Sequence, residues 1–246
     1  MNILGLDTST KKANVCLEYN NNTINKSIDN EITHSEKLLP LIDEVLKSTS
    51  ANLNDINYLA CSAGPGSFTG IRIGIATIKA FSKAFNIPVF NVSSLDILAY
   101  AKPSSDYIIS IMDAKNTRIY YCVYKLEHKN NIPYLNRICD YSNDTIDIAL
   151  EKISNILFNE QADSKTSINI TGDCIDTYKD LFISKLNPIS HNIITFEESL
   201  DASVLVSMLK NYIKIDTEKG YIQDYLTLDA IYVRPSQAER AKNNEL

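Results

Sequence analysis

Four of the seven glycines in this 246-residue chain fall in a single stretch, Gly64-Pro65-Gly66-Ser67-Phe68-Thr69-Gly70-Ile71-Arg72-Ile73-Gly74. A short apolar run over 58–63 precedes it and indicates a buried strand, and residues 71–85 have the pattern of a helix. A glycine-rich turn lets another group approach closely, and the helix N-terminus that follows it favours an anion. The stretch lacks the Lys-Ser/Thr of a Walker A loop and does not fit G-x-G-x-x-G. It therefore predicts either an anion site or a tight packing contact.

A second polar group, Asp7-Thr8-Ser9-Thr10, ends the first strand pattern of the chain. Its hydroxyls could hold phosphate oxygens, and Asp7 could hold a hydrated metal ion. The same residues also make ordinary turns that their own side chains cap, and both interpretations stay open. The candidate for a degenerate nucleotide or phosphate loop therefore comprises Asp7, Thr8, Ser9, Gly64, Gly66, Ser67 and Thr69.

Histidines and cysteines offer little further chemistry. The three histidines are His34, His128 and His191, and no two of them are close in sequence. One histidine with scattered acids makes a poor metal site, so we expect no metal and interpret His34 as a helix N-terminal or interface residue. The five cysteines form no C-x-x-C pair, and we expect them to be reduced thiols of the core.

The elements that must position these residues follow one order twice. In the first half, strand patterns fall at 2–6, 13–19, 23–28, near 58 and at 88–92, with helical patterns at 35–47, 71–85 and 94–101. In the second half, strands are predicted at 107–112, 118–124, 133–141, 168–171 and 192–196, with helices at 144–158, 175–186 and 202–213. Both halves therefore have the order βββαβαβα.

A weak internal echo supports this duplication, because Asp7 and Cys16 align with Asp113 and Cys122 at one offset. Two such halves facing each other make a two-domain α/β fold of the actin-like class (ASKHA), shared by Hsp70 and sugar kinases. The linker-like Lys102-Pro103-Ser104-Ser105 places the predicted boundary between subdomains at 1–102 and 103–246.

Composition limits the partners. The net charge of −6 argues against independent binding to nucleic acid, whose phosphates need a basic face. The chain has no signal-peptide pattern at its start, and no run approaches the roughly 20 apolar residues of a membrane helix. We therefore expect a cytoplasmic protein that does not contact the membrane.

Several segments together resemble the TsaB (YeaZ) family. They are residues 3–9, His34-Ser35-Glu36-Lys37-Leu38-Leu39-Pro40, the stretch 64–74, residues 92–95 and 112–115, and the ending Tyr232-Val233-Arg234-Pro235. The resemblance is densest over 1–125. It implies the actin-like fold and a non-catalytic dimerisation or scaffold subunit, not an enzyme by itself. The complex implied transfers a threonylcarbamoyl group to the adenosine beside the anticodon of ANN-reading tRNAs.

The resemblance also implies partners: a TsaD-like catalytic subunit, a TsaE-like ATPase, a homodimer in isolation, and tRNA only through the complex. Residues 71–85 are apolar nearly all round, and Gly70 and Gly74, four residues apart, would allow a second helix to come close. A core helix within one chain explains this pattern equally well, and the resemblance favours the interface. The predicted interface comprises His34, Leu38, Gly70, Arg72, Ile73, Gly74, Thr77, Ala80 and Ala84.

The main alternative is an enzyme of the same superfamily, either an ATP-dependent phosphotransferase or a glycoprotease-like metallopeptidase. The chain lacks the closely spaced histidine pair that the resemblance associates with the metal of TsaD-like subunits. Its second half offers only Gly172 and Gly220 for close approach to a nucleotide. We therefore expect no catalytic residues and no tightly bound cofactor, with at most weak or vestigial ATP or ADP binding.

Overall fold

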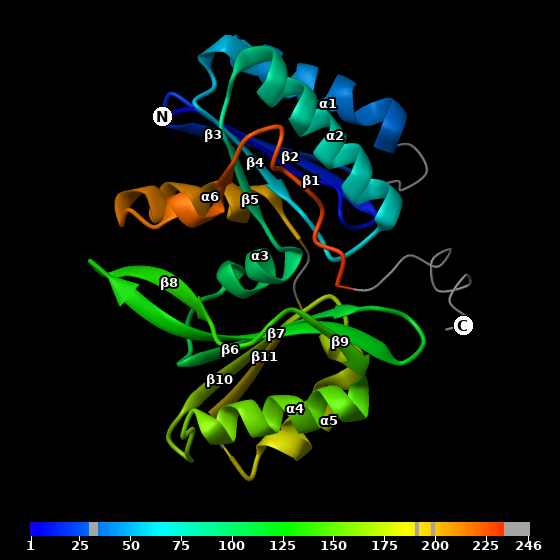
Figure 1. Ribbon diagram of the computed structural model, residues 1–246, viewed down its shortest axis with the longest axis vertical. Helices are drawn as coiled ribbons and strands as arrows, with labels where there is room; N and C mark the ends of the chain where they lie inside the picture. The colour runs from blue at the N-terminus through cyan, green and yellow to red at the C-terminus, as the bar shows by residue number, and fades with distance from the viewer. Residues whose placement is uncertain (30–33, 190–191, 198–199, 234–246) are drawn as a thin grey trace.

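Two sheets, each with helices on both of its faces, make up the protein (Figure 1). The structure is a computed structural model that describes residues 1–29, 34–189, 192–197 and 200–233. The side chains of His34 and His191 and the predicted motif residues Arg234-Pro235 lie outside what it describes.

The first sheet has the strand order β12-β5-β4-β1-β2-β3. Its strands are β1 (Ile3–Asp7), β2 (Lys12–Tyr19), β3 (Asn22–Asp29), β4 (Tyr58–Ser62), β5 (Val89–Val92) and β12 (Ile222–Gln223). Strands β1, β4 and β5 are parallel, whereas β2, β3 and β12 are antiparallel to their neighbours. Helices α1 (His34–Ser48) and α2 (Phe68–Phe85) cover the outer face, and the short helix η2 (Leu53–Asp55) precedes β4.

The second sheet repeats the arrangement with the order β11-β10-β6-β7-β8. It contains β6 (Tyr107–Asp113), β7 (Arg118–Lys129), β8 (Ile132–Arg137), β10 (Ser167–Gly172) and β11 (Asn192–Glu197), and β9 (Ser142–Thr145) pairs with β7. Helices α4 (Ile146–Asn159) and α5 (Ile175–Leu186) pack on its outer side. Because β5-β4-β1-β2-β3 and β11-β10-β6-β7-β8 match strand for strand, the predicted duplication and the actin-like fold class are confirmed.

The last helix of each half packs on the sheet of the other half. Helix α3 (Ser94–Ala101) contacts β6 and β10, and α6 (Ala202–Lys214) contacts β1, β2 and β4 (Figure 1). Helix α3 is buried almost throughout and α6 buries its apolar face, and Phe90, Tyr100, Tyr124 and Tyr212 join them in a shared central core. Each half therefore completes the hydrophobic core of the other.

The predicted division at residue 102 separates the two sheets but does not describe the end of the chain. After α6, the segment η3 (Glu218–Tyr221) leads into β12, which pairs with β5 of the first sheet. Leu228 is then fully buried in the core under α1 and α2. Residues 200–233 therefore pack largely with the first half, because the inner face and the open edge of its sheet need covering.

Most predicted element limits agree with the structure to within a few residues, with two corrections. Helix α2 begins at Phe68, before the predicted Ile71, because the Ser67 hydroxyl accepts a hydrogen bond from the Gly70 N–H and caps the helix. The strand predicted over 133–141 ends at Arg137 as β8, and a separate strand that was not predicted, β9, follows at Ser142–Thr145, before the helix that was expected from 144. In the described part of the chain, no helix is both long and apolar enough to cross a membrane.

Candidate functional site

Asp7, at the end of β1, is buried completely. Its Oδ1 atom accepts hydrogen bonds from the Ser9 N–H at 3.2 Å, the Ser9 hydroxyl at 2.7 Å and the Ser62 hydroxyl. Its Oδ2 atom is buried without a hydrogen-bond partner among the described residues. Burial raises the pKa of this carboxyl, and the bonds from Ser62 and Ser9 oppose that rise. Asp7 is thus a carboxyl group without access to solvent. A ligand for a hydrated metal ion needs such access, so these surroundings do not suit the metal role considered for Asp7.

The glycine-rich loop lies directly against the turn that follows Asp7. Both predicted uses of the glycines, an anion site and a tight packing contact, need such a close approach. The Ser67 N–H donates to the Ser9 carbonyl oxygen at 2.6 Å. A Cβ atom at Gly66 would lie 2.2 Å from that same oxygen, so no other residue fits there without a shift. Of the remaining candidates, Gly64 accepts hydrogen bonds from Ser93 and Ser94, and Thr69 is exposed.

Helix α2 continues this close contact with Thr8. The Thr8 hydroxyl donates to the Gly70 carbonyl oxygen at 2.8 Å. A Cβ at Gly70 would lie 2.0 Å from the Thr8 carbonyl oxygen, and one at Gly74 would lie 2.3 Å from the Thr8 hydroxyl oxygen. The chain's own oxygen atoms therefore occupy the space beside the helix N-terminus. Of the two predicted uses of the glycines, the structure shows tight packing.

The predicted partner interface is corrected at three positions. Gly70 and Gly74 are buried against Thr8 and do not open a path for a second helix, and Leu38 is buried in the core beneath α1. The sequence pattern identified a close approach, but could not identify the approaching group.

The other described interface candidates share an accessible face of α2. Arg72, Ala80 and Ala84 are exposed, and Ile73 and Thr77 are half-buried. Near the start of this face, the Arg72 guanidinium lies 4.4 Å from the centre of the Phe68 ring, and its Nε donates to the Tyr232 hydroxyl at 3.1 Å. The Phe68 and Tyr232 rings stack with centroids 4.6 Å apart. These contacts hold the described end of the chain against the start of α2.

Asp113, the residue of the second half that aligns with Asp7, lies in different surroundings. Asp113 ends β6, and its backbone N–H donates to Asp173 at 3.0 Å. Partial burial opposes ionisation of Asp113, but hydrogen bonds from Lys115 outweigh it and lower the pKa of this carboxyl. The two aligned acids therefore differ in their electrostatics: the pKa of Asp7 is raised, and that of Asp113 is lowered.

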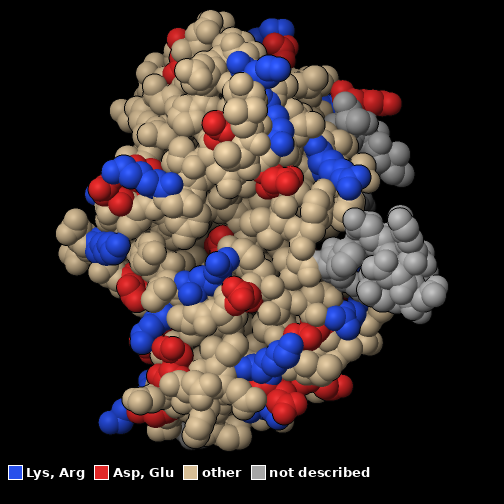
Figure 2. Space-filling model, viewed as in Figure 1, with Lys and Arg blue, Asp and Glu red and all other residues tan. Residues whose placement is uncertain are grey.

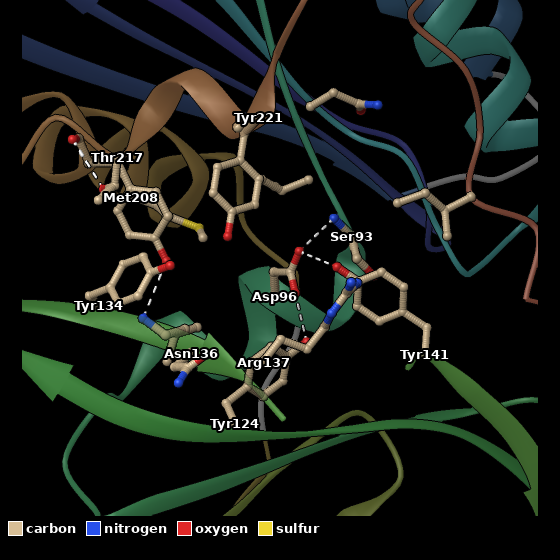
Figure 3. A pocket seen from close by; sticks show the side chains of 16 residues that line it. Ser93, Asp96, Tyr124, Tyr134, Asn136, Arg137, Tyr141, Met208, Thr217 and Tyr221 are labelled. Atoms are coloured by element: carbon tan, nitrogen blue, oxygen red, sulfur yellow. Dashed lines mark hydrogen bonds between the residues drawn. The ribbon is translucent and has the colours of Figure 1, made fainter. Parts of the chain in front are cut away.

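Between the halves lies a cavity of about 570 Å³ that sequence reasoning missed (Figure 3). Asp96 of α3 faces it and accepts hydrogen bonds from the Tyr124 and Tyr141 hydroxyls, both at 2.7 Å, and from the Ser93 N–H at 3.0 Å. Burial raises the pKa of Asp96, against the effect of these bonds. The Ser-x-x-Asp spacing of residues 93–96 is a capping-box signal that could have located this acid. Its three donors satisfy Asp96 within the chain.

Metal-binding groups do not gather in the described part of the protein, where no three His, Cys, Asp or Glu residues lie together as a metal site. On the face shown in Figure 2, Lys and Arg side chains alternate with Asp and Glu, and the described residues form no continuous basic patch. That face offers a phosphate backbone no extended positive surface.

The duplicated sheets define a two-domain α/β protein of the actin-like class. The TsaD family model, described as tRNA N6-adenosine threonylcarbamoyltransferase, matches residues 27–217. The TsaB protein of Buchnera aphidicola subsp. Acyrthosiphon pisum is 30% identical over 159 residues, which are 63% of this chain and 70% of that protein. The chain belongs to the TsaB (YeaZ) family, whose curated members are named tRNA threonylcarbamoyladenosine biosynthesis proteins.

Other relatives agree. The TsaB protein of Escherichia coli K12 is 33% identical over 129 residues, 51% of this chain. The match spans about half the length of that relative, namely 55%. The structure of YeaZ from Pseudomonas aeruginosa superposes with a TM-score of 0.71 at 20% identity, covering 94% of this chain and 99% of that one. At that identity the superposition shows a shared fold.

Proposed function

We propose that this protein is the non-catalytic subunit of a complex that transfers a threonylcarbamoyl group to the adenosine beside the anticodon of ANN-reading tRNAs. The observation that carries the proposal is the packing of Thr8 and Ser9 against Gly66, Gly70 and Gly74. A glycine-rich loop that binds phosphate must leave room for phosphate oxygens beside its glycines. Here the Thr8 and Ser9 oxygens fill that room, which supports a structural role and no tightly bound nucleotide.

The catalytic partner in this proposal is a TsaD-like subunit, and a TsaE-like ATPase completes the complex. The exposed face of α2, with Arg72, Ile73, Thr77, Ala80 and Ala84, is the proposed pairing surface. Small side chains there support it, because they let a facing helix approach toward the ~8 Å end of the packing range. In isolation the same face would join two copies of this chain. The tRNA would bind the assembled complex, since the net charge of −6 disfavours binding by this subunit alone.

Reconstitution tests the proposal. The purified chain, a TsaD-like subunit and a TsaE-like ATPase are mixed with tRNA, ATP and an activated threonylcarbamoyl donor, and modified adenosine is measured. We expect modification to require this chain and to survive Asp7→Asn, since Asp7 has no chemical role. The chain alone should hydrolyse no ATP and cleave no peptide, with or without divalent metal. Turnover by the isolated chain that Asp7→Asn abolishes while the variant stays folded would establish the phosphotransferase or peptidase alternative instead.

A further inference from the structure

Two cysteines from different segments lie together beside the cavity between the halves. Cys122 is on β7, Cys139 follows β8, and their sulfur atoms are 3.9 Å apart. Tyr124 is paired with Arg137, and the Ile138 N–H donates to the Val123 carbonyl oxygen at 3.0 Å, so the chain leaving β8 runs alongside β7 and brings Cys139 beside Cys122. Cys139 itself lies in the bend between β8 and β9, where no strand pairing fixes it. A disulfide has an S–S length of about 2.05 Å, so a short movement would bring the two sulfur atoms to bonding distance.

The two thiols differ in a way that suits stepwise chemistry. Cys122 is fully buried, and burial raises its pKa, whereas Cys139 is half-buried. The Cys139 sulfur lies within hydrogen-bonding distance of the Cys122 thiol and accepts a bond from the Val123 N–H at 3.2 Å. These contacts and the nearby Arg137 charge hold the pKa of Cys139 below its ordinary value, although burial and Asp140 oppose them. Cys139 is thus the thiolate that reacts first, and Cys122 is placed to follow.

We propose that Cys122 and Cys139 are a redox-active dithiol that a hydroperoxide converts into an intramolecular disulfide. The Cys139 thiolate attacks one oxygen of hydrogen peroxide, the O–O bond breaks, and the departing hydroxide takes up the thiol's released proton as water. The Cys122 sulfur then attacks the Cys139 sulfenic acid, the S–O bond breaks, and hydroxide leaves with the Cys122 proton as a second water. Two thiols are oxidised, and one peroxide is reduced to two waters.

The link would act on one wall of the cavity. Bond formation shortens the sulfur–sulfur distance from 3.9 Å to about 2.05 Å, so the link draws the Cys139 side chain toward β7 and ties the segment after β8 to that strand. Arg137 and Tyr141 flank Cys139, the Arg137 guanidinium lies 4.3 Å from the centre of the Tyr141 ring, and Tyr141 donates to Asp96 (Figure 3). Oxidation therefore restrains the wall of the cavity that carries the exposed cation Arg137. This inference does not depend on the proposed role in tRNA modification.

Mass spectrometry of the folded full-length chain after treatment with hydrogen peroxide tests the proposal. The intact mass should fall by two hydrogen atoms, and peptide mapping should join Cys122 to Cys139. The melting temperature should rise by roughly 6–12 °C, because the link closes a loop between residues 17 positions apart. Oxygen added to Cys139 without the loss of two hydrogens, or a link between other cysteines, would overturn it.

Variants sharpen the test. Cys139→Ser and Cys122→Ala should each abolish the mass loss, whereas Cys61→Ser should retain it, because Cys61 is buried in the other half. In the untreated protein, iodoacetamide should label Cys139 at least tenfold faster than Cys16 or Cys61, whose pKa values burial raises to about 12. Equal labelling of the three would contradict the assignment of Cys139 as the reactive thiol. This measurement uses the natural protein, so it does not depend on whether a variant folds.

Discussion

The Thr8 side chain is where the first turn and the glycine-rich loop depend on each other. Its hydroxyl donates to the Gly70 carbonyl oxygen at 2.8 Å, and the Thr8 hydroxyl oxygen lies 2.3 Å from where a Cβ of Gly74 would be. Glycine at position 74 is therefore required by a contact within the chain. A larger residue there should lower stability and leave pairing unaffected in the molecules that fold.

A double-mutant cycle checks this contact. Gly74→Ala should destabilise the protein by about 1–3 kcal/mol through overpacking, and much of that loss should disappear in a Thr8→Ala background. Gly220→Ala is the matched control, because a Cβ there meets nothing within 4 Å. Unfolding by denaturant gives all the values. A Gly74→Ala penalty that is the same with and without the Thr8 side chain would show that Thr8 is not the limiting contact.

The buried Asp7 carboxyl gives stability a pH dependence of a definite sign. Burial raises its pKa in the folded state, so between the unfolded and folded pKa values the folded state holds more protons. The contribution of Asp7 is present below the unfolded pKa of about 4 and is lost as pH rises through the folded pKa. The unfolding free energy of the natural protein minus that of Asp7→Asn should therefore fall as pH rises from about 4 toward neutral.

An exposed acid provides the opposite control. Hydrogen bonds from the backbone of Lys165 and from Thr166 lower the pKa of Asp163. Its contribution is present above the unfolded pKa and is lost as pH falls through the folded one, so the same difference for Asp163→Asn should rise with pH. Denaturant unfolding across a pH series measures both. A flat or rising difference for Asp7→Asn would mean that its carboxyl is not desolvated.

At the scale of elements, helix α2 has two faces with different roles. One face, with Gly70, Gly74, Ile71 and Ile78, is buried against the first turn and the sheet. The other carries the exposed Arg72, Ala80 and Ala84. The sequence of α2 has apolar and small residues on both faces and so did not show which face is buried, because alanine fits both a core and a solvent-facing helix position.

Ala80→Arg tests the exposed face. Because Ala80 is exposed, the variant should melt within about 2 °C of the natural protein. It should nevertheless weaken binding to the TsaD-like subunit at least tenfold, about 1.4 kcal/mol, because a long charged side chain would hold the facing helix away. Leu181→Arg, at an exposed site on α5, should leave binding unchanged. Calorimetric titration measures affinity, and unchanged binding by Ala80→Arg would remove this face from the interface.

In the whole molecule, neither half is self-sufficient. Helix α6 covers the inner face of the first sheet, α3 covers that of the second, and β12 closes the edge at β5. The segment after β12 then buries Leu228 completely in the first half's outer core. The halves should therefore unfold together, and a fragment of residues 1–102 should not fold alone.

Leu228→Ala measures the contribution of the returning segment. The change should cost about 2–5 kcal/mol, since it leaves a cavity in a packed core. Leu226→Ala, two residues away at a side chain that is 73% exposed, should cost under about 0.5 kcal/mol. Thermal or denaturant unfolding compares the two. Equal small effects would show that the first half does not rely on the end of the chain.

The sequence by itself determined most of the elements, their order and the family, but not the short strands β9 and β12. Helix α3 spans Ser94–Ala101 and α5 spans Ile175–Leu186, both as predicted, because apolar spacing and capping residues are local signals. The duplication followed from the repeated element order, and the glycine-rich stretch was correctly tied to a close contact. The resemblance to TsaB rested on short motifs that survive in the chain itself.

Only the tertiary structure decided which groups meet. It placed Thr8 against Gly74, returned Leu228 to the first half, surrounded Asp96 with tyrosines and brought the Cys139 sulfur beside that of Cys122. A sequence pattern reports that a position is small or buried, since that depends on the residue and its near neighbours. The identity of the group on the other side depends on how distant segments pack, and neither spacing nor composition records that.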